Sequence, residues 1–468
     1  NMSGGDNPIE YSASGNATIH VTGGTLTVGG QIRRSPSSDA GILHYLQSGG
    51  TVIAGNNAAT VNNRGVFEIL NAGSTFIMTG GDLYIARSQT NPSVPAFYFN
   101  PETCNFGASA NLHIGHSSTP SSQIIGIHAG KPLPRLRINN TSAANPKVTA
   151  RLETVAATIT SLLQIDAGTS FDANGLDLIL NGDMYASGTF IPEGNTTYFS
   201  GGGTQTINGT GNTVTFYNID KTAQNDLVLN AGNTPLLVLN ALSLQAGTLS
   251  DNGNTITVRG NVLNNASHVN NGAGDGIVMS GNITQVLAGN GTFGKLTISN
   301  NSGVSIPVGN QLFITGSLKM QAGVLNIGSN LLDLGINAVI EEASPFSSAN
   351  MIETNISFTD NGVRKTFRPD ASPVFTFPMG SGNKYTPVML NITANGNDTG
   401  SITVKAANEV HPGILEDTES GPQIVDRDNA LQYYWTLRAS DITGFSAVAR
   451  MKYDEDDVRV TVPYTVAD

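Results

Sequence analysis

The densest acidic run of the sequence lies near its C-terminal end. Four consecutive carboxylates, Asp454, Glu455, Asp456 and Asp457, follow Tyr453. Carboxylate and carbonyl oxygens are the ligands that Ca²⁺ prefers in proteins. The run is therefore the leading candidate for a metal site, with calcium as the metal, and a solvated loop is the alternative. No other cofactor is predicted.

Other aspartates are spaced in a way that would suit catalysis in a coiled fold. Enzymes that cleave polysaccharides gather carboxylates on one face. Asp251 and Asp275 are 24 residues apart, so they would stack in a fold with coils of that length. A second set lies within one such length: Asp166, Asp172, Asp177 and Asp183. Most of these residues have Gly or Asn nearby, which is typical of turns, and we expect structural positions for all of them.

Histidine and cysteine offer little further chemistry. His113 and His116 are three residues apart, and on a strand such residues point to opposite faces, so a metal site with His128 is not expected. Cys104 is predicted to be a buried small apolar residue. The sequence has no HExxH, CxxC, Walker or nucleophile-elbow motif. We therefore expect no catalytic residues and no enzyme activity.

Alternation of apolar and polar residues replaces helical periodicity in most of the chain. Runs such as Thr255–Val258 and Lys295–Ile298 are flanked by Gly or Asn, which predicts short strands joined by turns. Only 12% of the 468 residues are charged, 54 are glycine and 39% are hydrophobic. This composition fits an all-β protein with a large apolar core.

Repeats indicate how the strands are arranged. A short phrase recurs at Gly23–Val28, Gly49–Ile53 and Ala72–Ile77, with its glycines 26 and 23 residues apart. That spacing matches one coil of a three-sided parallel β-helix. Each coil has an apolar inner face that only neighbouring coils can bury. Gly and Asn suit the corners because they tolerate positive φ.

A longer repeat, with a period of roughly 80 residues, has two markers. The first is a strand that ends in a turn, at Leu163–Thr169, Leu242–Thr248 and Leu318–Val324. The second is a glutamine followed by a Gly-rich turn and another strand: Gln123 with Leu136–Asn140, Gln205 with Phe216–Asp220, and Gln285 with Leu296–Asn300. Such a length would contain three or more coils. We expect the marked segments to occupy matching levels of one stacked solenoid.

A change in composition predicts a domain boundary near residue 344. Residues 1–344 contain 32 charged side chains, whereas the shorter segment 345–468 contains 26 and also the single tryptophan, Trp435. The repeat phrases stop there while strand-like alternation continues. We predict a parallel β-helix over 1–344 and an antiparallel β-sandwich-like module over 345–468.

Charge and hydropathy exclude two classes of partner. The net charge is −12, and a chain poor in Lys and Arg cannot neutralise many phosphates, so nucleic acid is not an expected partner. No stretch approaches the roughly 18 apolar residues of a transmembrane helix.

Three phrases in the last part of the chain carry a resemblance: Phe375–Gly380, Tyr385–Pro387 and Tyr434–Leu437. Together with the long repeat, they are similar to modules of large secreted proteins of Bacteroidetes-type bacteria, over about residues 100–468. The resemblance implies export by the type nine secretion system and a place at the outer cell surface or outside the cell. That route uses a C-terminal sorting domain, which this sequence does not show, so we expect a processed or truncated piece of a longer protein.

The function predicted from these features is structural or adhesive, with the solenoid as spacer or scaffold. One alternative is a carbohydrate-binding or polysaccharide-degrading β-helix, in which Tyr433, Tyr434 and Trp435 would stack on sugars, although we expect Trp435 in the core. Another is a subunit of an extracellular filament or secretion assembly, formed by head-to-tail pairing of solenoid ends. The expected partners are components of the cell surface or secretion machinery, or glycans.

Overall fold

The computed structural model describes residues 6–12, 15–139, 141–143, 147–354, 361–369, 373–394, 396, 399–414 and 427–461. The chain forms two compact units, Asn1–Asn254 (unit 1) and Thr255–Asp468 (unit 2). Strands account for 53% of the chain, and the one helix in the described ranges is the 3₁₀ turn η1 (Glu455–Asp457). No described helix is long and apolar enough to span a membrane. The prediction of an all-β fold is confirmed.

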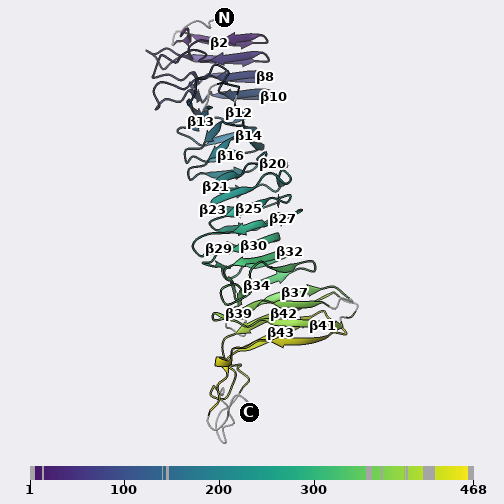
Figure 1. Cartoon of the computed structure of the whole chain (residues 1–468). Helices are drawn as coiled ribbons and strands as arrows, with labels where there is room; N and C mark the ends of the chain where they lie inside the picture. The colour runs from purple at the N-terminus through teal and green to yellow at the C-terminus, as the bar shows by residue number, and fades with distance from the viewer. Residues whose placement is uncertain are drawn as a thin grey trace. The chain divides into compact units, whose positions relative to one another are not determined.

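Unit 1 is a parallel β-solenoid. One of its faces is an eight-stranded sheet formed by β1 (Ile9–Tyr11), β4 (Ile32–Arg34), β7 (Phe67–Ile69), β9 (Phe97–Phe99), β11 (Ile124–Ala129), β13 (Thr149–Leu152), β15 (Ser170–Asp172) and β18 (Thr189–Ile191). The strands of the other faces are β2 (Asn16–Val21), β3 (Thr25–Thr27), β5 (Ile42–Gln47), β6 (Thr51–Ala54), β8 (Thr75–Ile85), β10 (Thr103–Ile114), β12 (Leu133–Ile138), β14 (Ala157–Ile165), β16 (Leu178–Leu180), β17 (Asp183–Ala186), β19 (Thr196–Phe199), β20 (Gln205–Asn208), β21 (Val214–Lys221), β22 (Leu227–Leu229), β23 (Leu236–Leu244) and β24 (Thr248–Ser250). Successive strands of this unit lie one above another as rungs (Figure 1).

Several strands are long enough to bend around a corner and serve two faces. The first half of β8 pairs with β5, and its second half pairs with β6. The interior is filled by the inward residues of each strand, including a cluster of aromatic rings. Tyr45 stacks on Phe76 at 4.7 Å between ring centroids, and Phe67 meets both rings edge-on. The coils therefore share one apolar interior, as the alternating pattern predicted.

The predicted alignment of the short repeat is correct for the first two copies and wrong for the third. Thr25 pairs with Thr51, so these two copies stack in register. The next residue on that ladder is Asp82, because the intervening coil is longer. The predicted third copy instead places Phe76 beside Tyr45 of β5, on a neighbouring face. The longer coil thus shifted the true third copy to Gly80–Ile85.

The long repeat corresponds to a repeated local structure. In each copy the second marker strand pairs with the first marker strand, in β12–β14, β21–β23 and β30–β32. Each of these three pairings contains a register shift near its middle. The turn glycines that follow have positive φ in all copies: Gly168 (80°), Gly247 (70°) and Gly323 (89°). The last residue of the first predicted strand, Asn140, lies outside the described residues.

The two copies in unit 1 nevertheless occupy different faces of the solenoid. Leu163 pairs with Met184 and so belongs to the ladder β14, β17, β20, β22 and β24. Leu242 pairs with Ile219 on the ladder β16, β19, β21 and β23. The prediction of matching levels is therefore wrong here, because the coils differ in length and the repeat does not contain a whole number of them.

Glutamine side chains link consecutive coils at the start of β20 and β29. In both cases the side-chain amide donates to two carbonyls of the preceding coil, and the side-chain oxygen accepts from a glycine N–H four residues earlier, Gly201 or Gly281, at 2.8 Å. The carbonyl acceptors are Leu180 (2.9 Å) and Gly182 (2.7 Å) for Gln205, and Val258 (3.1 Å) and Gly260 for Gln285. Gln123 differs, since its oxygen accepts from Ser88.

Unit 2 begins with parallel coils and ends with antiparallel sheets. Its parallel strands are β25 (Thr255–Val258), β26 (Val262–Asn264), β27 (Ser267–Val269), β28 (Gly276–Met279), β29 (Gln285–Ala288), β30 (Thr292–Ser299), β31 (Val304–Ser305), β32 (Gln311–Ala322), β33 (Leu325–Gly328), β34 (Leu331–Leu334), β35 (Val339–Glu342), β36 (Ile352–Thr354), β37 (Val363–Phe367) and β39 (Met379–Ser381). The remaining strands are β38 (Val374–Phe377), β40 (Lys384–Tyr385), β41 (Val388–Ala394), β42 (Gly400–Ala407), β43 (Tyr434–Ser440) and β44 (Ser446–Met451).

The antiparallel part contains two three-stranded arrangements, as a sandwich requires. β37, β42 and β43 pair in that order (Figure 1), and β38, β41 and β44 form a separate sheet. Phe375 of β38 meets Phe367 of β37 at 6.0 Å, edge to face, so apolar faces meet there. Parallel pairing continues beyond residue 344, through β36, β37 and β39. The change of pairing thus comes later in the chain than the change in composition.

Candidate functional site

The predicted calcium ligands do not converge in the structure. Asp457 is buried and forms an ion pair with Lys384, while Asp454, Glu455 and Asp456 are exposed. The Asp454 carboxylate caps η1 by accepting from the Asp456 N–H. In the described part of the chain, no group of three or more His, Cys, Asp or Glu could hold a metal ion. Calcium binding here stays a prediction.

Most of the aspartates considered for catalysis are engaged in backbone contacts. Asp177 accepts from the N–H of Thr196 at 2.9 Å, and Asp183 accepts from that of Thr206 at 2.8 Å, each in the following coil. Asp172 and Asp251 hold turns by accepting from the N–H two residues on. The remaining two are ion-paired: Asp166 with Arg137 at 2.8 Å, and Asp275 with Lys319 at 2.8 Å.

Two of the three histidines contact the same tyrosine ring, and the third lies elsewhere. His113 is buried, stacks on Tyr84 at 4.2 Å and bonds Asp82 at 2.8 Å. Burial lowers the pKa of His113, and the Asp82 hydrogen bond partly opposes that effect. His116 meets the same Tyr84 ring edge-on at 5.2 Å and contacts Ser118, while His128 contacts Thr154. These contacts hold the three rings in place.

Two single residues differ in part from their predicted burial. Cys104 is half-buried on β10, and desolvation raises the pKa of its thiol, which disfavours the reactive thiolate. Trp435 is also half-buried: its ring contacts Tyr433 at 5.1 Å, and its Nε1–H donates to the Thr386 carbonyl at 3.0 Å. The tryptophan ring is thus fixed by the module in which it lies.

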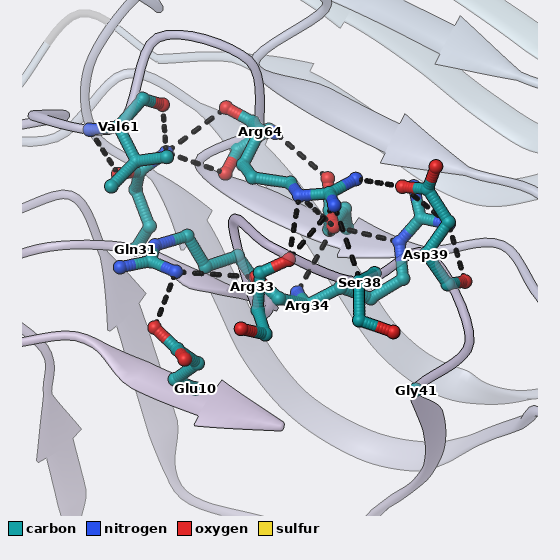
Figure 2. A network of polar contacts seen from close by, with 12 residues as sticks. Glu10, Gln31, Arg33, Arg34, Ser38, Asp39, Gly41, Val61 and Arg64 are labelled. Carbon is teal, nitrogen blue, oxygen red and sulfur yellow. Dashed lines mark hydrogen bonds and ion pairs between the residues drawn. The ribbon is translucent and has the colours of Figure 1, made fainter. Parts of the chain in front are cut away.

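A buried ionic network near the start of unit 1 was not anticipated from the sequence. Its centre is Glu68, whose side chain is 1% exposed and accepts from both the backbone N–H and Nε of Arg34. Arg64 lies 4.0 Å from the same carboxylate and binds Asp39 at 2.5 Å, and its guanidinium pulls the pKa of Asp39 down. Figure 2 shows how these arginines gather around one loop.

The charges of the network are paired within it, although Arg33 Nε has no hydrogen-bond partner among the described residues. Glu68 accepts a further hydrogen bond from the Gly65 N–H, and Arg33 pairs with Glu10 at 2.6 Å (Figure 2). Buried charges are stable only when they are paired and hydrogen-bonded in this way. Gln31 donates to the carbonyls of the same loop and closes it. The network joins several coils and leaves its central carboxylate occupied, so it is structural.

A cleft in unit 2 is a better candidate for ligand binding. It has a volume of about 660 Å³ and lies over the outward face of β37, β42 and β43. Strand register aligns its side chains in rows across the sheet. Arg364, Thr403 and Arg438 form the middle row. Ser401 and Ser440 form the next row on one side, and Lys405 and Thr436 form the row on the other. The opposite face is buried on β37 and β42, at Val363, Ile402 and Val404, whereas Leu437 of β43 is exposed.

The cleft combines cations with hydroxyls. Asp333 of β34 binds Arg364 at 2.5 Å, and this hydrogen bond raises the pKa of the guanidinium. The side chain of Arg438 is exposed and forms no ion pair or hydrogen bond with any residue in the described ranges. Asp441 follows the last residue of β43 and accepts from the Ser440 hydroxyl at 2.8 Å. The cleft floor therefore offers positive charge and hydroxyl groups, and its lining residues include no carboxylate pair.

This cleft was not anticipated from the sequence, although a signal was present. Ser401, Thr403 and Lys405 alternate with apolar residues, and so do Thr436, Arg438 and Ser440. The alternation identifies a polar face on each strand. It does not give the register that places Arg364 and Arg438 on either side of Thr403.

Comparison with protein-family models, curated proteins and solved structures gave no match for this chain.

Proposed function

We propose that this chain is a structural and adhesive protein of the outer cell surface, in which the solenoid serves as a spacer. The main support for this proposal is the set of contacts that the carboxylates of the chain form. Those that would suit catalysis hold turns, accept from the next coil or pair with a cation, as Asp177, Asp183 and Asp166 do. Groups committed to coil-to-coil contacts suit a stiff support.

The location rests on the resemblance of the repeat and of Phe375–Gly380 to secreted proteins of Bacteroidetes-type bacteria. Export by the type nine system, attachment through cell-surface components and a non-enzymatic role all belong to this proposal. The adhesive role is supported by the cleft in unit 2, which offers hydroxyls and positive charge from an otherwise acidic chain.

Three measurements test the proposal. Antibody labelling of producing cells should be equally strong before and after lysis, and labelling only after lysis would overturn the location. Beads coated with the protein should adhere to glycan-covered surfaces more than beads coated with albumin. Incubation with a panel of polysaccharides should release no reducing ends or unsaturated products. Any such release, lost when Asp166, Asp251 or Asp275 is changed to Asn, would establish the polysaccharide-degrading alternative.

A further inference from the structure

We propose that the cleft over β37, β42 and β43 binds an acidic polysaccharide. The first ground is charge. Arg364, Lys405 and Arg438 all line this one cleft, whereas the chain as a whole has a net charge of −12. Arginine is suited to carboxylate and sulfate groups because its planar fork can donate two parallel hydrogen bonds.

The second ground is the arrangement of the side chains. Neighbouring strands lie about 4.8 Å apart, so the two arginines of the middle row stand roughly 10 Å apart with a hydroxyl between them. That separation is comparable to the length of a disaccharide unit. A polysaccharide running across the strands would therefore place an anionic group at Arg364 and another at Arg438, with Thr403 facing the sugar between them.

The third ground is the rows on either side. On one side, the Ser401 hydroxyl can donate to and accept from sugar hydroxyls, and the Ser440 hydroxyl, which already donates to Asp441, can accept. On the other side, the Oγ1 of Thr436 is buried and has no hydrogen-bond partner among the described residues. The cleft volume of about 660 Å³ lies within the usual range of roughly 300–1,000 Å³ for small-ligand sites, enough for a short stretch of chain.

Arg364 is held by Asp333, so its part differs from that of Arg438. The ion pair fixes the guanidinium at one end of the row and leaves the exposed Arg438 to adapt to the ligand. Lys405 contributes a point charge beside them. We expect affinity to fall with salt, because these contacts are electrostatic and partly exposed.

The test uses the whole chain and three polymers: polygalacturonate, which carries carboxylates, dextran sulfate, which carries sulfates, and uncharged dextran. Binding is measured by biolayer interferometry at two salt concentrations. The wild-type protein should bind at least one charged polymer and should not bind dextran. Preference between the charged polymers identifies the anionic group. Equal binding of dextran, or no binding to either charged polymer, would overturn the inference.

Variants locate the site. The double substitution Lys405→Gln/Arg438→Gln should weaken binding at least tenfold, and Arg438→Lys should retain part of it. The matched control is Arg450→Gln/Lys452→Gln, which removes the same charge from exposed residues on or beside β44 and should change affinity less than twofold. Equal losses in both double variants would mean that only net charge matters. Circular dichroism and melting curves establish that each variant is folded.

A single-stranded oligonucleotide is included as a competing polyanion. If it binds more tightly than both charged polysaccharides, the glycan assignment is wrong. The inference deepens the adhesive part of the proposed function, and the two fail separately. Binding by a protein that is not displayed on cells would contradict the surface role alone, and surface display without binding would contradict the glycan site alone.

Discussion

Gln205 and Gln285, one in each unit, occupy equivalent positions in successive copies of the long repeat and share three hydrogen bonds, to which Gln285 adds one accepted from the Asn300 amide. Both side chains are buried, at 3% and 1% exposure. Each amide satisfies two carbonyls of the coil before it and fixes the Gly-rich turn that precedes its own strand. The long repeat is thus maintained by a polar contact as well as by apolar packing.

Replacing Gln285 with Ala should therefore destabilise unit 2. Two buried carbonyls lose their donor, which costs about 2–3 kcal/mol of unfolding free energy. Urea unfolding followed by circular dichroism measures the loss. The matched control is Gln245→Ala, because Gln245 is exposed and bonds only the Asp220 side chain through its amide, and its cost should stay within about 0.5 kcal/mol. Similar losses for both glutamines would contradict the role assigned to the buried one.

The substitution Glu68→Gln should be among the most damaging in unit 1. It removes the buried negative charge that balances Arg34 and Arg64, and breaking a buried ion pair costs about 3–5 kcal/mol. Asp39→Asn tests the exposed end of the same network and should cost much less, because water screens that carboxylate. Thermal unfolding of the two variants gives the comparison. A larger loss for Asp39→Asn would show that the network depends on its exposed rim.

The buried amino group of Lys365 should make the stability of the protein depend on pH. Burial lowers the pKa of its amino group to about 8 from an ordinary value of 10.5, while its Nζ donates to the carbonyls of Gly335 and Ile336. Between these two pH values the unfolded chain binds more protons at this residue than the folded chain does. The contribution of Lys365 to stability therefore rises with pH from about 8 to 10.5.

The measurement is the unfolding free energy of wild type and Lys365→Met across that range. As pH rises, the unfolding free energy of the wild type should increase relative to that of Lys365→Met by on the order of 2 kcal/mol. This is less than the full pKa shift implies, because water partly screens the amino group. Lys452→Met, at an exposed position, should give a profile parallel to the wild type. Parallel profiles for Lys365→Met as well would show that its amino group stays charged across the range.

Gly323→Ala should disrupt the turn after β32. The residue has a φ of +89°, and an added Cβ would overlap the carbonyl oxygen of Asn300. We expect a cost above about 2 kcal/mol, the left-handed backbone alone accounting for roughly 1–2 kcal/mol. Gly232→Ala is the matched control, since Gly232 also has positive φ, at +67°, but open space around its Cβ position. If urea unfolding gives equal costs for the two alanines, backbone conformation and not crowding decides the effect.

The solenoid could be predicted because the alternation of apolar and polar residues within each strand identifies the side that faces the interior. That information is local to the strand. The sequence also located the repeated bulged strand pairs, since Leu163–Thr169 and Leu242–Thr248 keep the same residue types. The faces on which these copies lie were not predictable, because the lengths of the intervening coils decide them. One longer coil, between Thr51 and its partner Asp82, was enough to misassign the third short repeat.

The functional residues were harder to identify for the same reason. The ionic network around Glu68 and the row from Arg364 to Arg438 both join residues that are distant in the chain. Their side chains come together only through the pairing register. The acidic run at Asp454–Asp457 attracted attention because it is contiguous, yet one of its members turns inward to Lys384.

The offset between the long repeat and the coil has a consequence for how such a molecule could evolve. In unit 1, equivalent side chains of successive copies face different directions, since Leu163 and Leu242 belong to different ladders. Duplicating the repeat would therefore distribute any surface group around the circumference instead of along one line. A lengthened descendant would gain the ability to engage neighbours on several sides at once.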